Sequence, residues 1–305
     1  DEITLTSTQT LLLGTRYDYY NQHGSIVSPR INYKLQPNKF NTIRLSIGNG
    51  FRVVNLFTED HAALSGAREV VIKSALKPEQ SWNGNLNYTK FMSKGKGFVT
   101  FDATAFYTYF TNRIIADFDS DPTKIIYDNL NGYSISRGLS LNADATFGFA
   151  LKVNVGATLM DVFKVEKNSF GFDEKSTQIH APKFSGTFQL SYTLRKANIT
   201  IDYTGQVYSP MRLPILPNDF RPEYSPWFAL QNIQFTKKIK TNLQVYAGIK
   251  NIFNFMPKNP IMRAFDPFDK RVNIDNPNGY TFDPSYNYAP LQARRLIVGV
   301  RYILF

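Results

Sequence analysis

Long runs in which apolar and polar residues strictly alternate are the feature that most constrains this chain. Between residues 139 and 147, Leu, Leu, Ala, Ala and Phe occupy the odd positions, while Ser, Asn, Asp and Thr occupy the even ones. Successive side chains of a β-strand point to opposite faces, so this pattern predicts strands with one apolar and one polar face. Comparable runs cover 41–53, 82–90, 99–110, 151–159, 187–194, 198–207, 242–250 and 294–304, and less regular ones lie near 9–20 and 26–36. No window of useful length has the period of an amphipathic helix.

The predicted strands are unusually long. We expect about twelve of them, many with ten or more residues, whereas strands of globular proteins average about five or six. Long strands of this kind suit a wall with lipid outside and water inside. A β-sandwich would also alternate, but its strands would be shorter. The alternation therefore predicts an all-β fold, an antiparallel transmembrane β-barrel.

The connections between the runs support the same fold, because short and long links alternate as they do in a transmembrane barrel. Short links lie near 37–40, 94–97, 147–149, 195–197 and 237–241, and longer ones near 20–25, 55–79, 119–123, 168–183, 211–225 and 255–293. Only 119–123 is short for its class, and we expect extended strands on both sides of it.

Composition excludes several other classes of protein. The 305 residues contain no Cys, which excludes disulfide scaffolds and Cys-ligated metal sites, and no run approaches the ~18–20 apolar residues of a spanning helix. The net charge of +11 would suit a nucleic-acid binder, but basic clusters such as Arg195–Lys196 lie between strand-like runs. Turn charges explain them better, so we expect no nucleic-acid partner. No catalytic motif is present, and we expect no enzyme activity.

Five motifs, in order, resemble those of the TonB-dependent receptors of Gram-negative outer membranes. They are S-P-R-I-N-Y at 28–33, R-L-S-I-G-N-G-F-R at 44–52, L-K-P-E at 76–79, R-G-L at 137–139 and N-I-F-N at 251–254, and a terminal G-V-R-Y strand follows at 299–302. Each motif alone is weak, but together they span some 270 residues. The resemblance implies that residues 1–305 are the C-terminal portion of one 22-stranded barrel domain, with the plug domain and the first strands outside the chain.

The resemblance also implies a function and a location. The intact protein would be a multi-pass outer-membrane receptor that takes up a scarce nutrient, such as vitamin B12 or an iron or other metal chelate, with energy from TonB. Its partners would be outer-membrane lipid and lipopolysaccharide, TonB through an N-terminal part upstream, a small-molecule nutrient, and a surface lipoprotein lid. Alternatives are a glycan importer that works with such a lid, a passive porin, and a scaffold for outer-membrane assembly.

The motifs place a first group of candidate residues on the lumen face, against the plug: Arg44, Gly48, Gly50, Arg52, Glu79, Asn85 and Ser140. Arg44 and Arg52 share a face by their spacing. Gly48 and Gly50 either leave space for the plug or relieve curvature of the sheet. Members of the family often carry Glu where this chain has Asn85 and Ser140, so we expect polar, uncharged contacts there in place of an ionic latch. Asn251 and Asn254 lie where a strand gives way to a loop, and local backbone hydrogen bonding explains them.

A second group of candidates lies in the predicted extracellular loops. Long loops without secondary structure of their own are usually functional or disordered, and aromatic side chains with polar tips suit a flat or amphipathic ligand. The candidate ligand contacts are Phe57, Glu59, His61, Arg221, Tyr224, Phe265, Phe268, Tyr280, Tyr286 and Tyr288. Alternate carboxylates at Asp117, Asp119 and Asp121 are a weak candidate for Ca²⁺, although the Gly and bidentate Glu of an EF-hand are missing. An ordinary polar loop is the alternative, and we expect no other cofactor.

Overall fold

The computed structural model describes residues 1–54, 69–117, 120–121, 124–168, 170–216, 218–274 and 276–304, without the side chain of Lys94. Seventeen strands and one short 3-10 helix occur in these ranges. The long strands are β2 (Gln9–Tyr20), β3 (Gly24–Asn38), β4 (Asn41–Arg52), β6 (Glu79–Lys94), β7 (Gly97–Asn112), β10 (Gly132–Thr146), β11 (Leu151–Lys167), β13 (Phe184–Leu194), β14 (Ile199–Tyr208), β15 (Phe228–Lys240), β16 (Leu243–Lys250) and β17 (Arg295–Tyr302). The short elements are β1 (Glu2–Thr6), β5 (Glu69–Ile72), β8 (Ile114–Asp117), β9 (Lys124–Asn129), β12 (Asp173–Thr177) and η2 (Arg195–Ala197).

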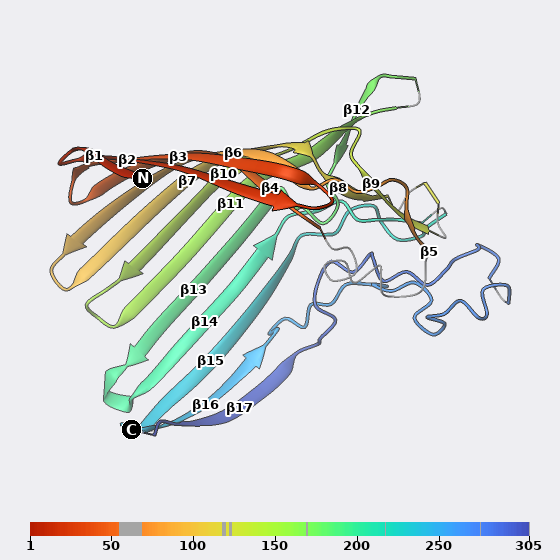
Figure 1. The fold of residues 1–305 in the computed structure, drawn as a ribbon. Helices are drawn as coiled ribbons and strands as arrows, with labels where there is room; N and C mark the ends of the chain where they lie inside the picture. Colours follow the sequence, from red (N-terminus) through yellow and green to blue (C-terminus); the bar gives the residue numbers. More distant parts are fainter. Residues whose placement is uncertain are drawn as a thin grey trace.

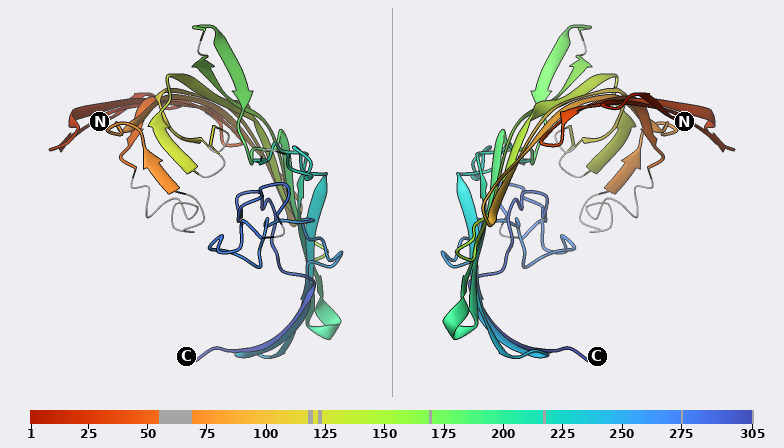
Figure 2. Two further views of the ribbon diagram at one scale, coloured as in Figure 1. Left: turned by 90° about the vertical axis from the view of Figure 1, so that its right-hand side faces the viewer. Right: turned by 90° about the vertical axis from the view of Figure 1, so that its left-hand side faces the viewer.

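The long strands form one antiparallel sheet in the order of the chain. Thirteen strands pair as β1-β2-β3-β4-β6-β7-β10-β11-β13-β14-β15-β16-β17. Strand β12 pairs with residues 163–167 of β11, which makes fourteen strands in all. The twelve long strands match the predicted number, while β1, which alternates over only five residues, and β12, which is wholly polar, were not expected. Within the described residues, β1 and β17 each pair on one side, so the sheet is an open arc (Figures 1 and 2).

The register separates a polar face from an apolar face across the whole sheet. Arg44 lies opposite Asn87, which lies opposite Thr104, which lies opposite Ser140, which lies opposite Thr158. The residues next to these in each strand point to the opposite face, and they are apolar and lie opposite one another in the same way. They include Leu45, Leu86, Leu139 and Leu159, which are 40, 50, 39 and 57% exposed. An apolar face this large and this exposed requires an apolar surrounding, which a lipid bilayer supplies.

A second, smaller sheet lies on the concave side of the arc (Figure 2). Its order is β5-β9-β8, with β5 parallel to β9 and β8 antiparallel to it. The buried side chains of Ile125 and Tyr127 hold it together, packed against apolar side chains that include Val54 and Val70. Strands flank 119–123 on both sides as expected, but they are the short β8 and β9 of this sheet and not parts of the long strands, since β7 ends at Asn112.

The two ends of the large sheet differ in their connections (Figure 1). Tight turns at 7–8, 39–40, 95–96, 147–150, 195–198 and 241–242 form one end, which we call the turn end. Long segments at 53–78, 113–131, 168–183, 209–227 and 251–294, together with the turn at 21–23, form the opposite end, the loop end. In the described part of the chain, no helix is long and apolar enough to cross a membrane.

Candidate functional site: the loop end and the concave wall

Three of the long segments are fastened together at the loop end. The backbone N–H of His180, in segment 168–183, donates to the carbonyl of Arg212, and its ring Nε2 lies 2.9 Å from the carbonyl oxygen of Ser285. His180 therefore touches both segment 209–227 and segment 251–294. Its φ of 56° shows that the backbone turns sharply at this position.

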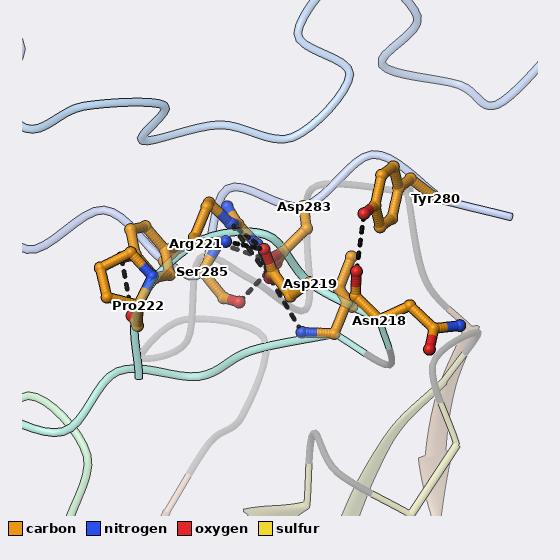
Figure 3. Close-up of polar contacts among 9 residues, drawn as sticks. Asn218, Asp219, Arg221, Pro222, Tyr280, Asp283 and Ser285 are labelled. Carbon is orange, nitrogen blue, oxygen red and sulfur yellow. Dashed lines mark hydrogen bonds and ion pairs between the residues drawn. The ribbon is translucent and has the colours of Figure 1, made fainter. Parts of the chain in front are cut away.

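A buried ion cluster joins the last two of these segments (Figure 3). Nη2 of Arg221 lies 2.7 Å from Oδ2 of Asp219 and 3.0 Å from Oδ2 of Asp283, and all three side chains are at most 1% exposed. The Arg221 guanidinium carbon lies 4.1 Å from the centroid of the Tyr286 ring, whose hydroxyl donates to the carbonyl of Pro222 at 2.9 Å. We call Asp219, Arg221, Asp283 and Tyr286 the clasp.

Hydrogen bonding keeps the Asp219 carboxylate charged despite its burial. Burial raises the pKa of Asp219, but the Arg221 side chain and the backbone N–H groups of Leu216 and Arg221 donate to the carboxylate. These donors outweigh burial, and the pKa of Asp219 lies below its ordinary value. Burial lowers the pKa of Arg221, but the hydrogen bonds that Arg221 donates to Asp219 and Asp283 raise it, and the net pKa is raised. Asp219 and Arg221 are therefore both ionised at neutral pH.

An apolar core lies beside the clasp, where the two segments meet the sheet. Met211, Leu213, Phe228, Tyr286 and Ala289 are its buried members. The rings of Phe228 and Phe255 stack with centroids 4.9 Å apart, and Tyr288 packs against both at 5.5 and 6.5 Å. Burial raises the pKa of Tyr288. The two segments are thus held as a packed unit rather than as free loops.

Segment 251–294 starts from a left-handed turn that its own Asn side chains stabilise. Asn251 and Asn254 have φ of 51° and 56°. The Asn251 amide donates to the carbonyls of Phe255 and Gln292, and its Oδ1 accepts from the N–H of Phe255. Oδ1 of Asn254 accepts from the N–H of Arg294. The predicted backbone role of both residues is confirmed.

The structure divides the predicted loop contacts into buried and exposed side chains. Arg221 and Tyr286 are 5% and 2% exposed and serve the clasp, and Tyr288 packs in the core. The half-buried Tyr280 donates to the carbonyl of Asn218 at 2.7 Å. The side chains that a ligand can reach are Tyr224, Phe265 and Phe268, which are 50, 73 and 69% exposed. Phe57, Glu59 and His61 lie outside the described residues.

The exposed aromatic rings of segment 251–294 carry cations beside them. The Arg263 guanidinium carbon lies 4.8 Å from the Phe265 ring centroid, and Nζ of Lys270 lies 5.7 Å from that of Phe268. Arg263 also pairs with Asp266 at 2.9 Å. That pair is buried, so this surface presents flat apolar area together with the positive charge of the exposed Lys270. Phe220, which is 60% exposed and 6.1 Å from the Tyr280 ring, belongs to the same end and was missed by the sequence analysis.

Below the loop end, a polar cavity of about 380 Å³ lies against the concave wall. Wall residues of β11, β13, β14 and β15 line it, and residues 290–293 of the long segment cover it, so the polar face of the sheet is the concave one (Figure 2). Lys250 of β16 and Arg295 of β17 lie opposite each other in the sheet, and both line this cavity. Sequence analysis missed this cationic pair, although its register position follows from the alternation.

All seven candidates for the lumen face lie on this polar face. Their contact with a plug domain stays a prediction. Arg52 pairs with Glu79 at 2.7 Å, and the buried Glu79 also accepts from the N–H of Ile114, which ties the wall to the start of β8. Ser140 bonds Thr158 at 3.0 Å, Asn85 is exposed, and Nη1 of Arg44 lies 3.4 Å from Asn87.

A Cβ at Gly48 would lie 3.2 Å from the carbonyl oxygen of Pro29, so close strand approach accounts for this glycine. At Gly50 a Cβ would meet only ordinary contacts.

The predicted calcium site is only partly visible. Asp117 accepts from the N–H and the hydroxyl of Ser120, and Asp121 pairs with Lys124 at 3.5 Å. Asp119 lies outside the described residues. Among the residues that the structure describes, no group of three His, Cys, Asp or Glu side chains is placed to hold a metal ion. Calcium binding at Asp117, Asp119 and Asp121 stays a prediction.

Known proteins share both the sequence and the fold of this chain. Over 270 residues, the chain is 24% identical to the iron-regulated outer membrane virulence protein of Vibrio cholerae El Tor. The aligned region covers 83% of this chain and 40% of that relative. A ferric enterobactin receptor mutant from Pseudomonas aeruginosa superposes with a TM-score of 0.60 at 16% identity over 83% of this chain and 38% of that one. The apoprotein form of the FrpB iron transporter from Neisseria meningitidis superposes with a TM-score of 0.65 at 16% sequence identity. That match covers 97% of this chain and 44% of the transporter.

These similarities cover this chain far better than they cover the known proteins. The chain spans 40% of the length of the curated relatives that it matches. A family model described as TonB dependent receptor-like, beta-barrel matches residues 1–252, which is most of the sheet. The family consists of receptors of Gram-negative outer membranes rather than enzymes, and the resemblance seen in the five sequence motifs is confirmed. The chain belongs to the β-barrel family of the TonB-dependent outer-membrane receptors.

Proposed function

We propose that the intact receptor containing this barrel segment takes up an iron chelate, with energy supplied through TonB. The observation that carries the proposal is the similarity over 270 residues to an iron-regulated outer membrane protein of Vibrio cholerae. The similarity in fold to a ferric enterobactin receptor and to an iron transporter is consistent with it.

The chemistry of the loop end supports a chelate as the ligand. Phe265 and Phe268 present exposed rings, and the exposed Lys270 places positive charge beside Phe268, whereas the charge of Arg263 is paired with Asp266. An iron chelate with a flat or amphipathic organic frame and negative charge would contact both features. The cavity below, with Lys250 and Arg295 at its edge, would continue the polar and cationic surface into the lumen.

The other predicted ligands and roles have less in their favour. Vitamin B12 stays a prediction from the sequence motifs alone. None of the similarities reported above points to a glycan importer, a passive porin or an assembly scaffold. A surface lipoprotein lid likewise stays a prediction.

The proposal is tested by uptake of radioactive ferric chelates into cells that carry the intact receptor as their only iron-chelate importer. We expect uptake to stop when an uncoupler removes the proton-motive force. We expect the double variant Phe265→Ala/Phe268→Ala to bind the chelate about tenfold or more weakly, since exposed aromatic anchors carry much of a binding energy. The exposed Phe170, on segment 168–183, is the control: Phe170→Ala should bind as the wild type does.

Two outcomes would contradict the proposal. Equal uptake with and without the uncoupler would indicate a passive pore. Uptake of vitamin B12 but of no ferric chelate in the same cells would replace the ligand while leaving the transport role in place.

A further inference from the structure

The turn end of the sheet carries cations without carboxylate partners. Lys39, Lys96, Arg195, Lys196, Lys237 and Lys240 are exposed, and each lies in one of the tight turns or directly beside it. Lys237 belongs here because it lies opposite Ile199, the first residue of β14 after the turn at 195–198. We call these six residues the basic rim. No Asp or Glu occurs within two residues of any turn at this end.

The contacts of the basic rim are with neutral groups. Arg195 donates to the carbonyl of Gly148 at 3.0 Å, Lys237 donates to the carbonyl of Ala197, and Nζ of Lys39 lies 5.1 Å from the centroid of the Phe40 ring. In the parts of the chain that the structure describes, none of the six forms an ion pair with a carboxylate. Their positive charge is therefore left for something outside these strands.

The apolar face of the sheet reaches the basic rim. Leu194, which ends β13 directly before Arg195, is 39% exposed. Phe235, two residues before Lys237 on the same face, is 45% exposed. The exposed rings of Phe147 and Phe149 stack with centroids 5.3 Å apart in the turn at 147–150. Toward the turn end, apolar side chains are thus followed within a few residues by aromatic rings and then by cations. A bilayer has the matching order of acyl chains, interface and headgroups.

We propose that the basic rim binds the phosphate headgroups of anionic glycerophospholipids in the membrane leaflet at the turn end. Charge complementarity argues for an anion, and the adjoining apolar belt argues for an anion attached to acyl chains rather than a soluble one. Binding of this kind would anchor the depth of the barrel in that leaflet. The inference does not depend on which nutrient the receptor imports.

The test uses the intact receptor that contains these strands, in nanodiscs with equal amounts of phosphatidylglycerol and phosphatidylethanolamine. Native mass spectrometry measures which lipid stays bound after release. We expect at least about fivefold enrichment of phosphatidylglycerol, because one basic residue at an anionic lipid surface already contributes about fivefold. High salt should reduce the enrichment.

Two matched variants decide the origin of the enrichment. The rim variant replaces all six cations with Gln, which keeps donors for the carbonyls of Gly148 and Ala197: Lys39→Gln, Lys96→Gln, Arg195→Gln, Lys196→Gln, Lys237→Gln and Lys240→Gln. The control removes the same charge from exposed lysines of the loop end: Lys73→Gln, Lys77→Gln, Lys167→Gln, Lys175→Gln, Lys183→Gln and Lys258→Gln. Heat-modifiable migration in gels checks that both variants fold.

The rim variant should lose the enrichment and the control should keep it. Enrichment that survives in the rim variant, or that falls equally in both, would overturn the proposal. So would equal retention of the two lipids by the wild type. Displacement of phosphatidylglycerol by soluble peptidoglycan fragments would show that the basic rim serves a soluble polyanion instead, which also overturns it.

Discussion

The two ends of the same sheet use charge in opposite ways. At the loop end, cations and carboxylates occur together, and pairs such as Arg221 with Asp219 are buried at 2.7 Å. At the turn end, six exposed cations have no nearby acid in the sequence, and Arg195, Lys237 and Lys39 contact two carbonyls and a ring. A buried charge needs a partner to offset the loss of water, whereas an exposed charge at an interface needs none. The buried charge of the loop end therefore holds the protein together, and the charge of the tight turns is available to the surroundings.

The backbone shows the same contrast. Most non-Gly residues with positive φ lie at the loop end, among them His180, Asn251 and Asn254. The turn end has only Ala150 and Asn198 in the described part of the chain. Irregular backbone at the loop end has to be held by specific side-chain bonds, while the tight turns are held by the ladders on either side of them.

The clasp offers the largest expected difference between the ends. Arg221→Ala would leave two buried carboxylates without their cation, and we expect the packed unit of segments 209–227 and 251–294 to lose about 3–5 kcal/mol. Hydrogen exchange of the intact receptor should show both segments opening together. The more exposed pair of Arg212 and Glu223 is the control, since Arg212→Ala should cost about 1 kcal/mol or less. Unchanged protection in Arg221→Ala would show that the clasp is not what joins the segments.

A pair of left-handed asparagines allows a closer comparison. Asn251 at the loop end and Asn198 at the turn end have nearly equal φ, 51° and 52°, so replacement by Ala carries the same backbone cost. Asn251→Ala also removes the bonds to Phe255 and Gln292, and it should cost about 1–3 kcal/mol more than Asn198→Ala. Local hydrogen-exchange free energies around each site measure the difference. Equal costs would mean that the Asn251 side-chain bonds do not contribute.

Acid should loosen the loop end. The pKa of Asp219 is lower in the folded protein than in the unfolded chain, so its ionised form contributes stability that is complete above the unfolded pKa, about 4. This stability is lost as pH falls through the lower, folded pKa. Protection of segments 209–227 and 251–294 should therefore be constant from neutral pH to about pH 5 and should decline below about pH 4. The tight turns of the turn end have no Asp or Glu within two residues, and a parallel decline in those turns would contradict the assignment.

The smallest effect on stability is expected at the basic rim. Each single Lys→Gln change there should alter the free energy of unfolding by about 0.5 kcal/mol or less, because exposed side chains without partners contribute little. Lys96→Gln and Lys240→Gln are suitable probes, with unfolding followed by the loss of heat-modifiable migration across a urea series. A cost above about 1 kcal/mol would reveal an internal role for these charges, and the contrast between the two ends would weaken.

Much of the wall could be predicted from the sequence, because a strand of period two records its two faces in the order of its residues. Arg44 and Arg52 share a face in the structure as their spacing predicts, and the other wall candidates lie on the same face. The turn role of Asn251 was also predictable, since its bonds with Phe255 are local. The bond from the N–H of Arg294 to Asn254 was not, because the two residues lie 40 positions apart.

The loop end was less predictable because its contacts join residues far apart in the chain. Strand β5 pairs in parallel with β9 more than fifty residues later, and no local pattern in 119–123 indicates it. Arg221 was predicted to contact ligand because it lies in a long loop. The approach of Asp283, 62 residues away, instead places it inside the protein.

By itself, the sequence determined the strands, their two faces, the tight turns and the family, because each of these depends on spacing within a few residues or on short motifs. Only the tertiary structure decided which loop side chains are buried and which remain exposed, since Phe265 and Tyr286 look alike as aromatic residues of one long segment. It also separated paired charge from unpaired charge. The net charge of +11 does not reveal that separation, which depends on which carboxylates the folded chain brings to each cation.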